Sequence, residues 1–430
     1  MEIAVVGLGH VGLPLSCVLA DRGFKVIGID VDEVKVRSIN DGVSPLKGEE
    51  PGLERLLSKM VHEGHLKAYT GTSLIGEAEG IFVCVDTPMG EDHRPDLTSL
   101  RRAVSSIGDH LVKDTLVSVE STIPPLTMTG MVVPTLEERS GLRAGEDFSL
   151  VHCPERVMPG RLLYNIQNYE RILGGLDERS RMKGMDLYSR FLNVKIHPTD
   201  LISAEITKTV ENAYRDVQIA FANEVALACE ELGADAYRIR GLVNTCPFRD
   251  MHLPGSGVGG HCIPKDPWLL MSSVSRELDL LPSARRVNDG MPDHLASLAE
   301  EALSQAGMPL DRARVTLFGL GFLRDSGDVR NSPAMRVIDL LEGRCRLEVH
   351  DPFVEEGYKV PLTRDLKEAL EGSDCAVFVT DHSLYSELDL GEMRDLMGTP
   401  IIVDGRNIFR AEECRRAGFV YRGIGKAHSD

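Results

Sequence analysis

The sequence predicts an α/β protein in which two domains, each built on a parallel β-sheet, are joined by a central helical domain with one long helix. In both terminal parts of the chain, short β-rich runs alternate with helix-compatible stretches, a rhythm typical of parallel sheets covered by helices. Between these parts, residues 201–232 contain no Gly or Pro and carry apolar side chains at three- and four-residue intervals. That period predicts one long amphipathic helix.

The β-rich runs follow one another in a clear order. In the N-terminal part they are EIAVVG, KVIGID, GIFVCVD, TLVSVEST and DFSLVHCPE, and the helix-compatible run VGLPLSCVLADRG follows the first of them. In the C-terminal part they are RVTLFGLGF, RLEVHDP, DCAVFVT and PIIVDGRN. We therefore expect three domains, at residues 1–198, 199–300 and 301–430.

Composition excludes several classes of protein. At 430 residues the chain exceeds what one hydrophobic core usually organises, and Asp plus Glu (66) exceed Lys plus Arg (48), for a net charge of −18. Such acidity argues against a broad surface for DNA or RNA. No apolar stretch is long enough for a membrane span, and MEIAVVGLG is predicted to be a strand rather than a signal peptide. The nine cysteines form no CxxC pair, so we expect a cytoplasmic protein without a zinc site.

A glycine motif follows the first predicted strand. Gly7, Gly9 and Gly12 lie where the strand ends and a helix begins, and glycines there permit a tight turn and let a pyrophosphate approach the helix N-terminal amides. Asp30 closes the run KVIGID, where its carboxylate would accept ribose hydroxyls and repel a 2′-phosphate. A glycine turn that binds nothing is disfavoured by this combination. The sequence therefore predicts a Rossmann-like domain that binds NAD rather than NADP.

A second glycine pair, Gly319 and Gly321, follows a predicted strand of the C-terminal part. The third glycine is missing at the proper offset, so we interpret the pair as a degenerate half-site in a second Rossmann-like domain. A nucleotide could still lie at the carboxyl ends of these strands. A binding site and a purely structural turn remain equal alternatives.

A glycine-rich loop surrounds Cys262. In PGSGVGGHCIPKD the thiol lies beside His261 and four residues before Asp266. Such loops bring the backbone close to a substrate, a thiolate is a good nucleophile toward carbonyl carbon, and nearby amides could stabilise the oxyanion. From these residues alone, a buried inert cysteine and a structural histidine remain open.

Polar side chains follow one face of the predicted long helix. Lys208, Asn212 and Arg215 are spaced by four and three residues, and Glu205 lies on the preceding turn of the same face. Such a stripe is usually solvated, which is the default interpretation. Because the neighbouring residues are apolar, a functional cleft is the competing hypothesis.

Taken together, these motifs resemble those of the UDP-glucose/GDP-mannose dehydrogenase family over nearly the whole chain. The resemblance implies a four-electron oxidation in which NAD takes a hydride twice at the same sugar carbon, C6 of a UDP-sugar. Chance recurrence of so many spaced motifs is not credible. In order they are GLGHVG with Asp30, CVDTP, ESTIPP, CPERVMPG, RILGG, EITKTVENAYRDVQIAFANE, GSGVGGHCIPKDP, DVRNSPA, the DP after RLEVH, and DGRN.

The resemblance implies a role for each catalytic residue. Cys262 matches the family nucleophile, which captures the aldehyde as a thiohemiacetal and later carries a thioester that water cleaves. Lys208 and Asn212 match the groups that stabilise negative charge on the C6 oxygen. Glu155, in CPER, matches a carboxylate that handles protons or water, and Asp266 matches the acidic residue near the nucleophile.

The resemblance also implies the binding residues. Arginines are suited to anionic ligands because a guanidinium grips phosphate bidentately. The implied NAD contacts are His10 and Val11 in the glycine turn, Thr87, Thr122 and Arg330. The implied UDP-sugar contacts are Arg156, Val157, Arg215, Gly259, Phe322 and Arg406.

Within the family, CPERVMPGR followed by YERILGG is most similar to the enzymes that act on UDP-N-acetyl-D-mannosamine. Three residues depart from that subgroup: Cys246 and Phe248 replace an expected histidine and arginine, and Leu323 replaces an expected lysine. UDP-GlcNAc and UDP-glucose therefore stay alternative substrates. In the family the long helix pairs subunits, which implies a homodimer or larger assembly.

Two alternatives belong to other classes of protein. A nucleotide-sugar-binding protein without turnover is disfavoured by the intact Cys262, Lys208 and Glu155. A one-hydride dehydrogenase of the 3-hydroxyacid type would share the N-terminal domain but has no use for HCIPKDP.

Overall fold

The computed structural model describes residues 1–46, 50–90 and 92–427. The chain forms two compact units: Met1–Glu211 with Trp268–Glu277, and Asn212–Pro267 with Leu278–Asp430. Two helices, α8 (Leu201–Glu231) and α10 (Cys262–Ser272), begin in one unit and end in the other. The predicted three-domain boundaries stay a prediction.

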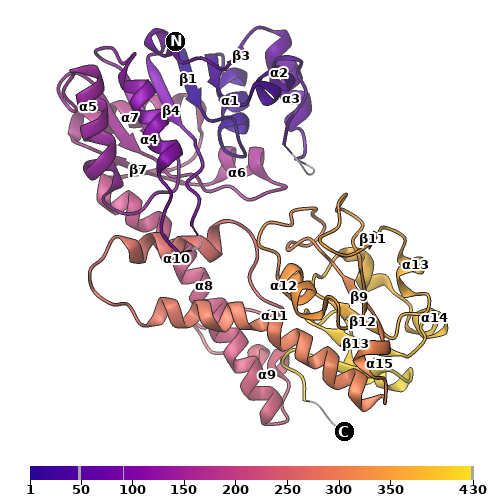
Figure 1. The fold of residues 1–430 in the computed structure, drawn as a ribbon. Coiled ribbons are helices and arrows are strands. Elements are labelled where there is room, and N and C mark those ends of the chain that lie inside the picture. The colour runs from indigo at the N-terminus through magenta and orange to yellow at the C-terminus, as the bar shows by residue number, and fades with distance from the viewer. Residues whose placement is uncertain (47–49, 91, 428–430) are drawn as a thin grey trace. The chain divides into compact units, whose positions relative to one another are not determined.

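The first unit is built on an eight-stranded sheet in the order β3-β2-β1-β4-β5-β6-β7-β8 (Figure 1). The strand order reverses between β1 and β4, which is the topological switch point where nucleotides bind in such sheets. All neighbouring strands are parallel except β6 and β7. The strands are β1 Glu2–Val6, β2 Lys25–Ile29, β3 Leu66–Tyr69, β4 Gly80–Val83, β5 Leu116–Val119, β6 Ser149–His152, β7 Arg171–Gly175 and β8 Ile196–Asp200.

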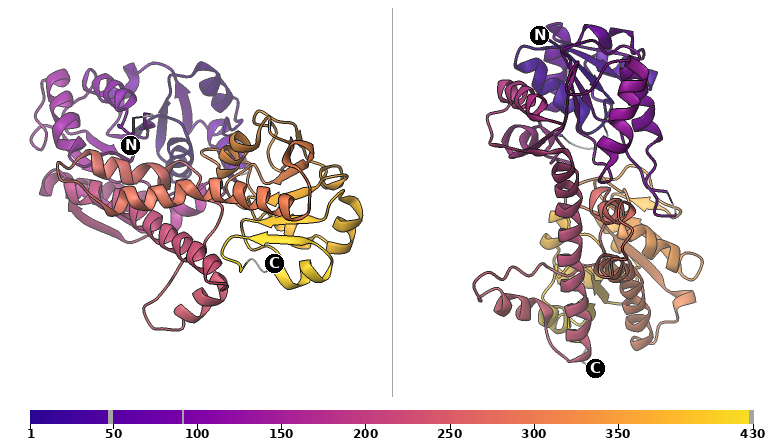
Figure 2. Two further views of the ribbon diagram at one scale, coloured as in Figure 1. Left: turned by 60° about the horizontal axis from the view of Figure 1, so that its bottom comes forward. Right: turned by 90° about the vertical axis from the view of Figure 1, so that its left-hand side faces the viewer.

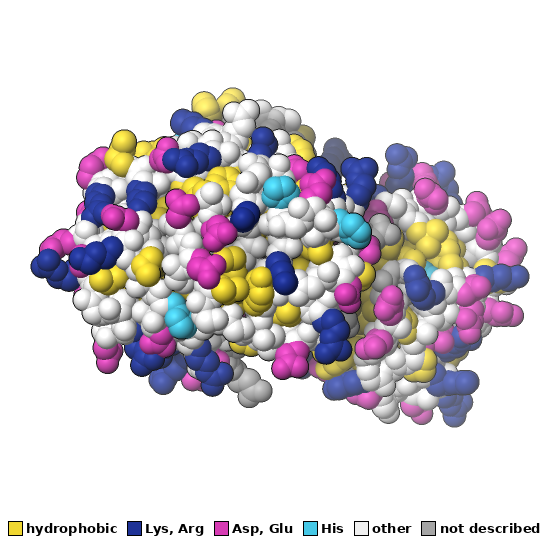
Figure 3. All heavy atoms as spheres, turned by 90° about the horizontal axis from the view of Figure 1, so that it is seen from above, with side chains coloured by type: hydrophobic (Ala, Val, Ile, Leu, Met, Phe, Trp, Pro, Cys, Tyr) yellow, Lys and Arg dark blue, Asp and Glu magenta, His cyan; other side chains and the backbone are white. Residues whose placement is uncertain are grey.

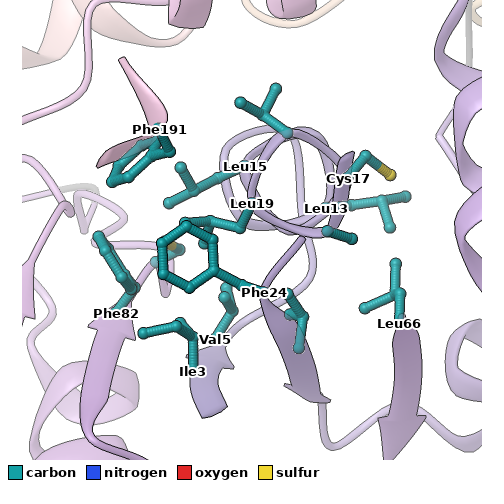
Figure 4. Close-up of a cluster of buried hydrophobic side chains, with 14 of the residues drawn as sticks. Ile3, Val5, Leu13, Leu15, Cys17, Leu19, Phe24, Leu66, Phe82 and Phe191 are labelled. Carbon is teal, nitrogen blue, oxygen red and sulfur yellow. The ribbon is translucent and has the colours of Figure 1, made fainter. Parts of the chain in front are cut away.

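Helices cover both faces of this sheet because side chains alternate along each strand. In β1, Ile3 and Val5 join one buried apolar cluster, whereas Ala4 and Val6 join another. Figure 4 shows the first of these, with leucines of α1 lying above Ile3 and Val5. The helices of this unit are α1 Gly12–Asp21, α2 Glu33–Asn40, α3 Leu53–His62, α4 Thr98–Gly108, α5 Val133–Ser140, α6 Leu162–Asn168 and α7 Glu178–Phe191.

The second unit contains a six-stranded, fully parallel sheet in the order β11-β10-β9-β12-β13-β14. Its strands are β9 Arg314–Phe318, β10 Arg346–His350, β11 Leu362–Thr363, β12 Cys375–Phe378, β13 Ile401–Asp404 and β14 Val420–Gly423. Its helices are α9 Ala236–Val243, α11 Leu280–Gln305, α12 Pro333–Leu341, α13 Leu366–Leu370, α14 Leu390–Leu396 and α15 Ala411–Arg416. Figure 2 shows α8 and α11 as long, continuous helices.

The expected α/β architecture is confirmed: two sheets of the parallel type and a helical region between them along the chain. The long helix predicted for residues 201–232 is α8. Two features differ from expectation. The pairing of β6 with β7 is antiparallel, and the helical region contains a second long helix, α11, of 26 residues.

The surface carries charges of both signs. Over the face drawn in Figure 3, basic and acidic side chains are interspersed rather than gathered into one basic field. Across the described part of the chain, no helix combines the length and apolar character that a membrane crossing requires.

Candidate active site

The first glycine turn has the shape that a dinucleotide needs. Gly7 has φ +92°, and a Cβ there would lie 2.8 Å from the Cys84 carbonyl oxygen. A Cβ at Gly12 would overlap the carbonyl oxygen of Gly7. A Cβ at Gly9 would meet nothing within 4 Å, so this position faces open space where a pyrophosphate could approach the amides. The residues present therefore fit NAD.

Asp30 stands at the end of β2 with its carboxylate directed toward this turn. Its Oδ2 accepts hydrogen bonds from the Leu8 amide and from Lys35 Nζ, both at 2.9 Å. Its Oδ1 accepts from the Asp32 amide at 3.1 Å. These contacts fix the carboxylate beside the glycine turn, where the sequence placed it.

The other predicted NAD residues of the first unit lie at the same edge of the sheet. Thr87 and Thr122 follow β4 and β5, and Thr87 Oγ1 donates to the Thr122 carbonyl at 2.6 Å. Both side chains are buried. Val11 is the N-cap residue of α1, with His10 before it. Thr87 therefore ties together the loops that follow two neighbouring strands.

The turn that contains the second glycine pair, Gly319 and Gly321, binds a buried carboxylate from the neighbouring strand. Asp351, at the end of β10, is fully buried, and its Oδ2 accepts hydrogen bonds from the amides of Leu320 and Gly321, both at 2.8 Å. A Cβ at Gly319 would lie 2.5 Å from Thr380 Cβ. These turn amides are therefore held by a strand-end carboxylate, as the Leu8 amide is held by Asp30 in the first turn, and a nucleotide contact at this pair stays a prediction.

Glu155 and Lys208 form a buried ion pair in the first unit. Lys208 Nζ lies 3.2 Å from Glu155 Oε1, and each residue is 6% exposed. The Val157 amide donates to Glu155 Oε2 at 2.6 Å. Burial acts to raise the pKa of Glu155, but the Lys208 charge and the Val157 amide outweigh it and lower that pKa. Glu155 is therefore a carboxylate at neutral pH.

The default interpretation of the α8 polar stripe as solvated is wrong for half of its members. Glu205 is buried and accepts hydrogen bonds from the amides of Leu126 at 2.9 Å and Met128 at 2.7 Å. Burial raises the pKa of Glu205 to about 7, although these amides act to lower it. Lys208 is buried too, whereas Arg215 is exposed.

Cys262 is the first residue of α10 and is half-buried, so it is not sealed in an apolar core. By contrast, Cys17 is fully buried. One turn after Cys262, Asp266 is fully buried and its Oδ2 accepts a hydrogen bond from Asn212 Nδ2 at 2.5 Å. The second unit thus brings Asn212 and Asp266 together. The positive end of a helix favours negative charge near its first turn, which suits a thiolate.

The Cys262 loop packs tightly against predicted ligand-binding residues of the second unit. A Cβ at Gly259 would overlap Phe322, and one at Gly255 would lie 2.7 Å from Arg406 Nη1. Arg406 Nε donates to the Val379 carbonyl at 3.0 Å, and burial lowers the pKa of Arg406. Glycine is therefore required at Gly259, where the close atom is Phe322 Cβ, whereas the close atom at Gly255 is the movable end of the Arg406 side chain.

The remaining predicted binding residues have protein partners. Arg330 pairs with Asp328, Nε lying 2.9 Å from Oδ1. Arg156 forms an ion pair with Glu211. Arg215 Nη1 lies 3.4 Å from His252 Nε2.

The three residues that depart from the subgroup pattern all reach solvent. Cys246 is exposed, the Phe248 side chain is 99% exposed, and Leu323 is 38% exposed. Their surroundings within the chain therefore do not explain the substitutions.

A buried cluster beneath Glu155 was missed from the sequence. Arg171 in β7 pairs with Glu120 and donates to the Cys153 carbonyl at 2.8 Å. The Glu155 amide donates to the Glu120 carbonyl at 3.2 Å, and Tyr188 donates to the Glu120 carboxylate. The available signal was the charged residues within the otherwise apolar runs TLVSVEST and ERILGG.

Family models match almost the whole chain. The NAD-binding domain of the UDP-glucose/GDP-mannose dehydrogenase family matches residues 1–192, its central domain matches 202–290, and its UDP-binding domain matches 316–411. The chain belongs to the UDP-glucose/GDP-mannose dehydrogenase family. It is accordingly an NAD-dependent nucleotide-sugar dehydrogenase, and NAD is its cofactor.

Relatives and solved structures agree with this family. A UDP-N-acetyl-D-mannosamine dehydrogenase from Pyrococcus horikoshii is 37% identical over 99% of both chains. The solved structure of a UDP-D-ManNAc dehydrogenase from Pyrococcus horikoshii superposes with a TM-score of 0.93, at 36% identity over 100% of both chains. An NDP-N-acetyl-D-galactosaminuronic acid dehydrogenase from Methanosarcina mazei gives 0.89 at 39% identity, covering 99% of this chain and 95% of that one.

Proposed function

We propose that the protein oxidises the C6 alcohol of a UDP-N-acetylhexosamine to a carboxylate, with UDP-N-acetyl-D-mannosamine as the substrate and UDP-N-acetyl-D-mannosaminuronate as the product. The observation that carries the proposal is a half-buried thiol, Cys262, at the start of α10 and at the end of a glycine-rich loop, in a chain of this dehydrogenase family. A simple alcohol dehydrogenase has no need of such a nucleophile.

The overall reaction converts one alcohol, two NAD⁺ and one water into one carboxylate, two NADH and three protons. NAD, when bound, supplies the hydride acceptor for both oxidations. Cys262 Sγ adds to the C6 aldehyde and forms a thiohemiacetal; its oxidation leaves a thioester at the same sulfur. Water cleaves the C–S bond, which releases the acid and returns the thiolate. Covalent capture keeps the aldehyde from escaping between the two oxidations.

Lys208 and Asn212 are proposed to stabilise the charge that develops on the C6 oxygen. Preorganised cations and amide donors in a buried site are effective at this because they need no reorganisation during the reaction. Lys208 is already buried, and Asn212 is held by its bond to Asp266. These two residues lie one turn apart on α8, so they present their donors on the same helix face.

Glu155 is proposed to act as the base that activates water for thioester cleavage. Its lowered pKa keeps it ionised at neutral pH, which is the form that a general base requires. Asp266 is proposed to support the nucleophile segment through its bond to Asn212.

The proposed substrate rests on the names of the relatives and on CPERVMPGR followed by YERILGG. Purified protein should be screened for NADH production with UDP-ManNAc, UDP-GlcNAc and UDP-glucose at equal concentrations. UDP-ManNAc is expected to give the highest kcat/KM. A higher kcat/KM with either of the other two would reassign the substrate within the same reaction class.

The alternative of another class is a protein that binds nucleotide-sugars without turnover. Calorimetry that detects UDP-sugar binding, combined with no NADH from any of the three sugars, would favour that alternative. The intact Cys262, Lys208 and Glu155 support turnover instead.

We also propose a homodimer that pairs through α8. Apolar side chains recur along this helix and remain substantially accessible: Ile206 is 39% exposed, Val210 42%, Tyr214 63% and Phe221 57%. Burying such a stripe against a second copy would remove it from water. Light scattering on the purified protein measures the subunit number directly.

A further inference from the structure

The loop that leads into Cys262 is anchored at its beginning by buried groups. The Gly255 amide donates to Asn223 Oδ1 at 2.9 Å, and Ser256 Oγ donates to the Val379 carbonyl at 2.7 Å. Asn223 and Ser256 are fully buried. The first half of the loop is therefore fixed to α8 and to the end of β12.

The end of the loop is held by a different segment. The Gly260 amide donates to the Arg330 carbonyl at 2.8 Å, and Asn331 Nδ2 donates back to the Gly260 carbonyl at 3.0 Å. Two consecutive residues thus engage both polar groups of the peptide position that lies two residues before Cys262. The Phe322 ring closes the remaining space, because a Cβ at Gly260 would lie 2.9 Å from its Cζ.

This clamp acts on a loop whose glycines allow the backbone to change conformation. Gly257 has φ +125° and Gly260 φ +86°, and glycine pays little for changing between such conformations. A rotation at Gly260 would move the start of α10 and with it the thiol. Asn331 itself has φ +48°, a left-handed conformation that Asn, Asp and Gly tolerate better than other residues.

We propose that Asn331 is a positioning residue for Cys262, which it acts on through the Gly260 carbonyl. This proposal rests on the proposed function in one respect, namely that Cys262 is the nucleophile. Asn331 follows Arg330, to which the family resemblance gives a cofactor contact, so the clamp also connects a ligand-binding segment to the nucleophile loop.

The clamp should matter for one part of the reaction more than for the other. The thiol is needed only after the aldehyde has formed. A loosened Gly260 would therefore leave the first oxidation running while aldehyde capture slows, and some aldehyde would escape. A general loss of structure would slow both oxidations and leave the NADH yield per sugar unchanged.

The test uses Asn331→Asp and Asn331→Gly, which both suit the left-handed backbone but lack the amide donor. With limiting UDP-sugar, NADH per sugar should fall from two toward one, with aldehyde trapped by hydroxylamine. The kcat should fall about fivefold, as expected for one lost hydrogen bond. A wild-type NADH yield and a wild-type kcat in Asn331→Gly would overturn the proposal, since the backbone alone would then be sufficient to position Cys262.

A second measurement does not depend on turnover. Alkylation of Cys262 by iodoacetamide, followed by peptide mass spectrometry without substrate or NAD, should be at least about threefold faster in both variants because a looser loop exposes the half-buried thiol. The exposed Cys246 serves as the internal reference and should be unchanged. An unchanged Cys262 rate would overturn the proposal. Faster alkylation in a protein that gives no NADH with any UDP-sugar would support the clamp and refute the proposed function.

Asn40→Asp is the matched control. Asn40 Nδ2 donates to the Ala68 carbonyl at 2.9 Å, and the Ala68 amide donates to Asn40 Oδ1 at 2.8 Å, so this variant loses a comparable bond in the first unit. It should lower Tm while the NADH yield stays at two per sugar. A reduced yield in this control would mean that destabilisation alone causes the effect, which would overturn the proposal.

Discussion

Removing one partner of the buried Glu155–Lys208 pair should destabilise the protein far more than removing both. At 3.2 Å and an effective dielectric constant of about 20, the attraction between the two charges is about 5 kcal/mol. Desolvation of both ions offsets much of this gain, so the intact pair adds little net stability. Lys208→Met and Glu155→Gln each remove one member of this pair and leave the other charge buried, which typically costs about 3–5 kcal/mol.

The pH dependence gives this prediction a sign. The pKa of Glu155 is lowered in the folded protein, so its contribution to stability is present above the unfolded value of about 4.3 and is lost as pH falls through the folded pKa. In Lys208→Met the strongest influence that lowers the pKa of Glu155 is gone, so burial raises that pKa relative to the wild type. The penalty in that variant should therefore shrink as pH falls from 7 toward 5.

Urea unfolding at pH 7 and pH 5 measures these effects in Lys208→Met, Glu155→Gln and the double variant. We expect each single variant to lose about 3–5 kcal/mol at pH 7 and the double variant to lie within about 2 kcal/mol of the wild type. All three variants should be inactive. A stable but inactive double variant would show that the loss of activity does not come from unfolding. Single variants that lose less than about 1 kcal/mol, with additive losses in the double variant, would refute a buried, coupled pair.

Four further variants have expected outcomes of their own. The raised pKa of Glu205, about 7, means that its contribution to stability is present below the unfolded pKa and lost as pH rises through 7. In Glu205→Gln the change of urea midpoint between pH 5.5 and pH 8 should therefore be smaller than in the wild type; an equal change would contradict the shift. Gly9→Ala should keep the wild-type Tm, because its Cβ meets nothing within 4 Å. It should raise the KM for NAD at least about tenfold, because the methyl group fills the space of the pyrophosphate. An unchanged KM would contradict NAD binding at this turn. Gly259→Ala should lower kcat at least about tenfold, because the new methyl group overlaps Phe322 and misplaces the loop. Gly290 lies in α11, and a Cβ there would meet nothing within 4 Å. Gly290→Ala should therefore raise the free energy of unfolding by about 0.5–1 kcal/mol without loss of activity. Equal activity in Gly259→Ala and Gly290→Ala would contradict the tight packing at Gly259.

The fold was predictable where local patterns decide it. Short stretches of sequence are enough to indicate the strands, whose side chains alternate between two buried faces, and the helix α8, whose apolar period is uninterrupted. The helix α11 was not predicted as a second long helix because Gly290 and Pro292 lie inside it. Both residues ordinarily interrupt helices, but packing overrides that preference: Pro292 and Met291 are buried in the second unit. The antiparallel pairing of β7 likewise depends on long-range pairing, which no local run encodes.

The sequence motifs predicted which residues form the candidate site, but they did not predict which of those residues are buried. A glycine turn, an acidic residue at the next strand end and a glycine-rich loop before Cys262 are all visible in the sequence. Which face of α8 is covered depends on segments distant along the chain. Glu155 precedes its partner Lys208 by more than fifty residues, and the amides that hold Glu205 come from the loop after β5. Sequence spacing alone could not place those partners.

The most direct test of covalent catalysis by Cys262 is the number of NADH formed per UDP-sugar when the sugar is limiting, in the wild type and in Cys262→Ala. The wild type should form two NADH and release the carboxylate, whereas Cys262→Ala should form at most one and release aldehyde that hydroxylamine traps. Two NADH per sugar at the wild-type rate in Cys262→Ala, or one NADH with free aldehyde from the wild type, would contradict a thioester route through this thiol.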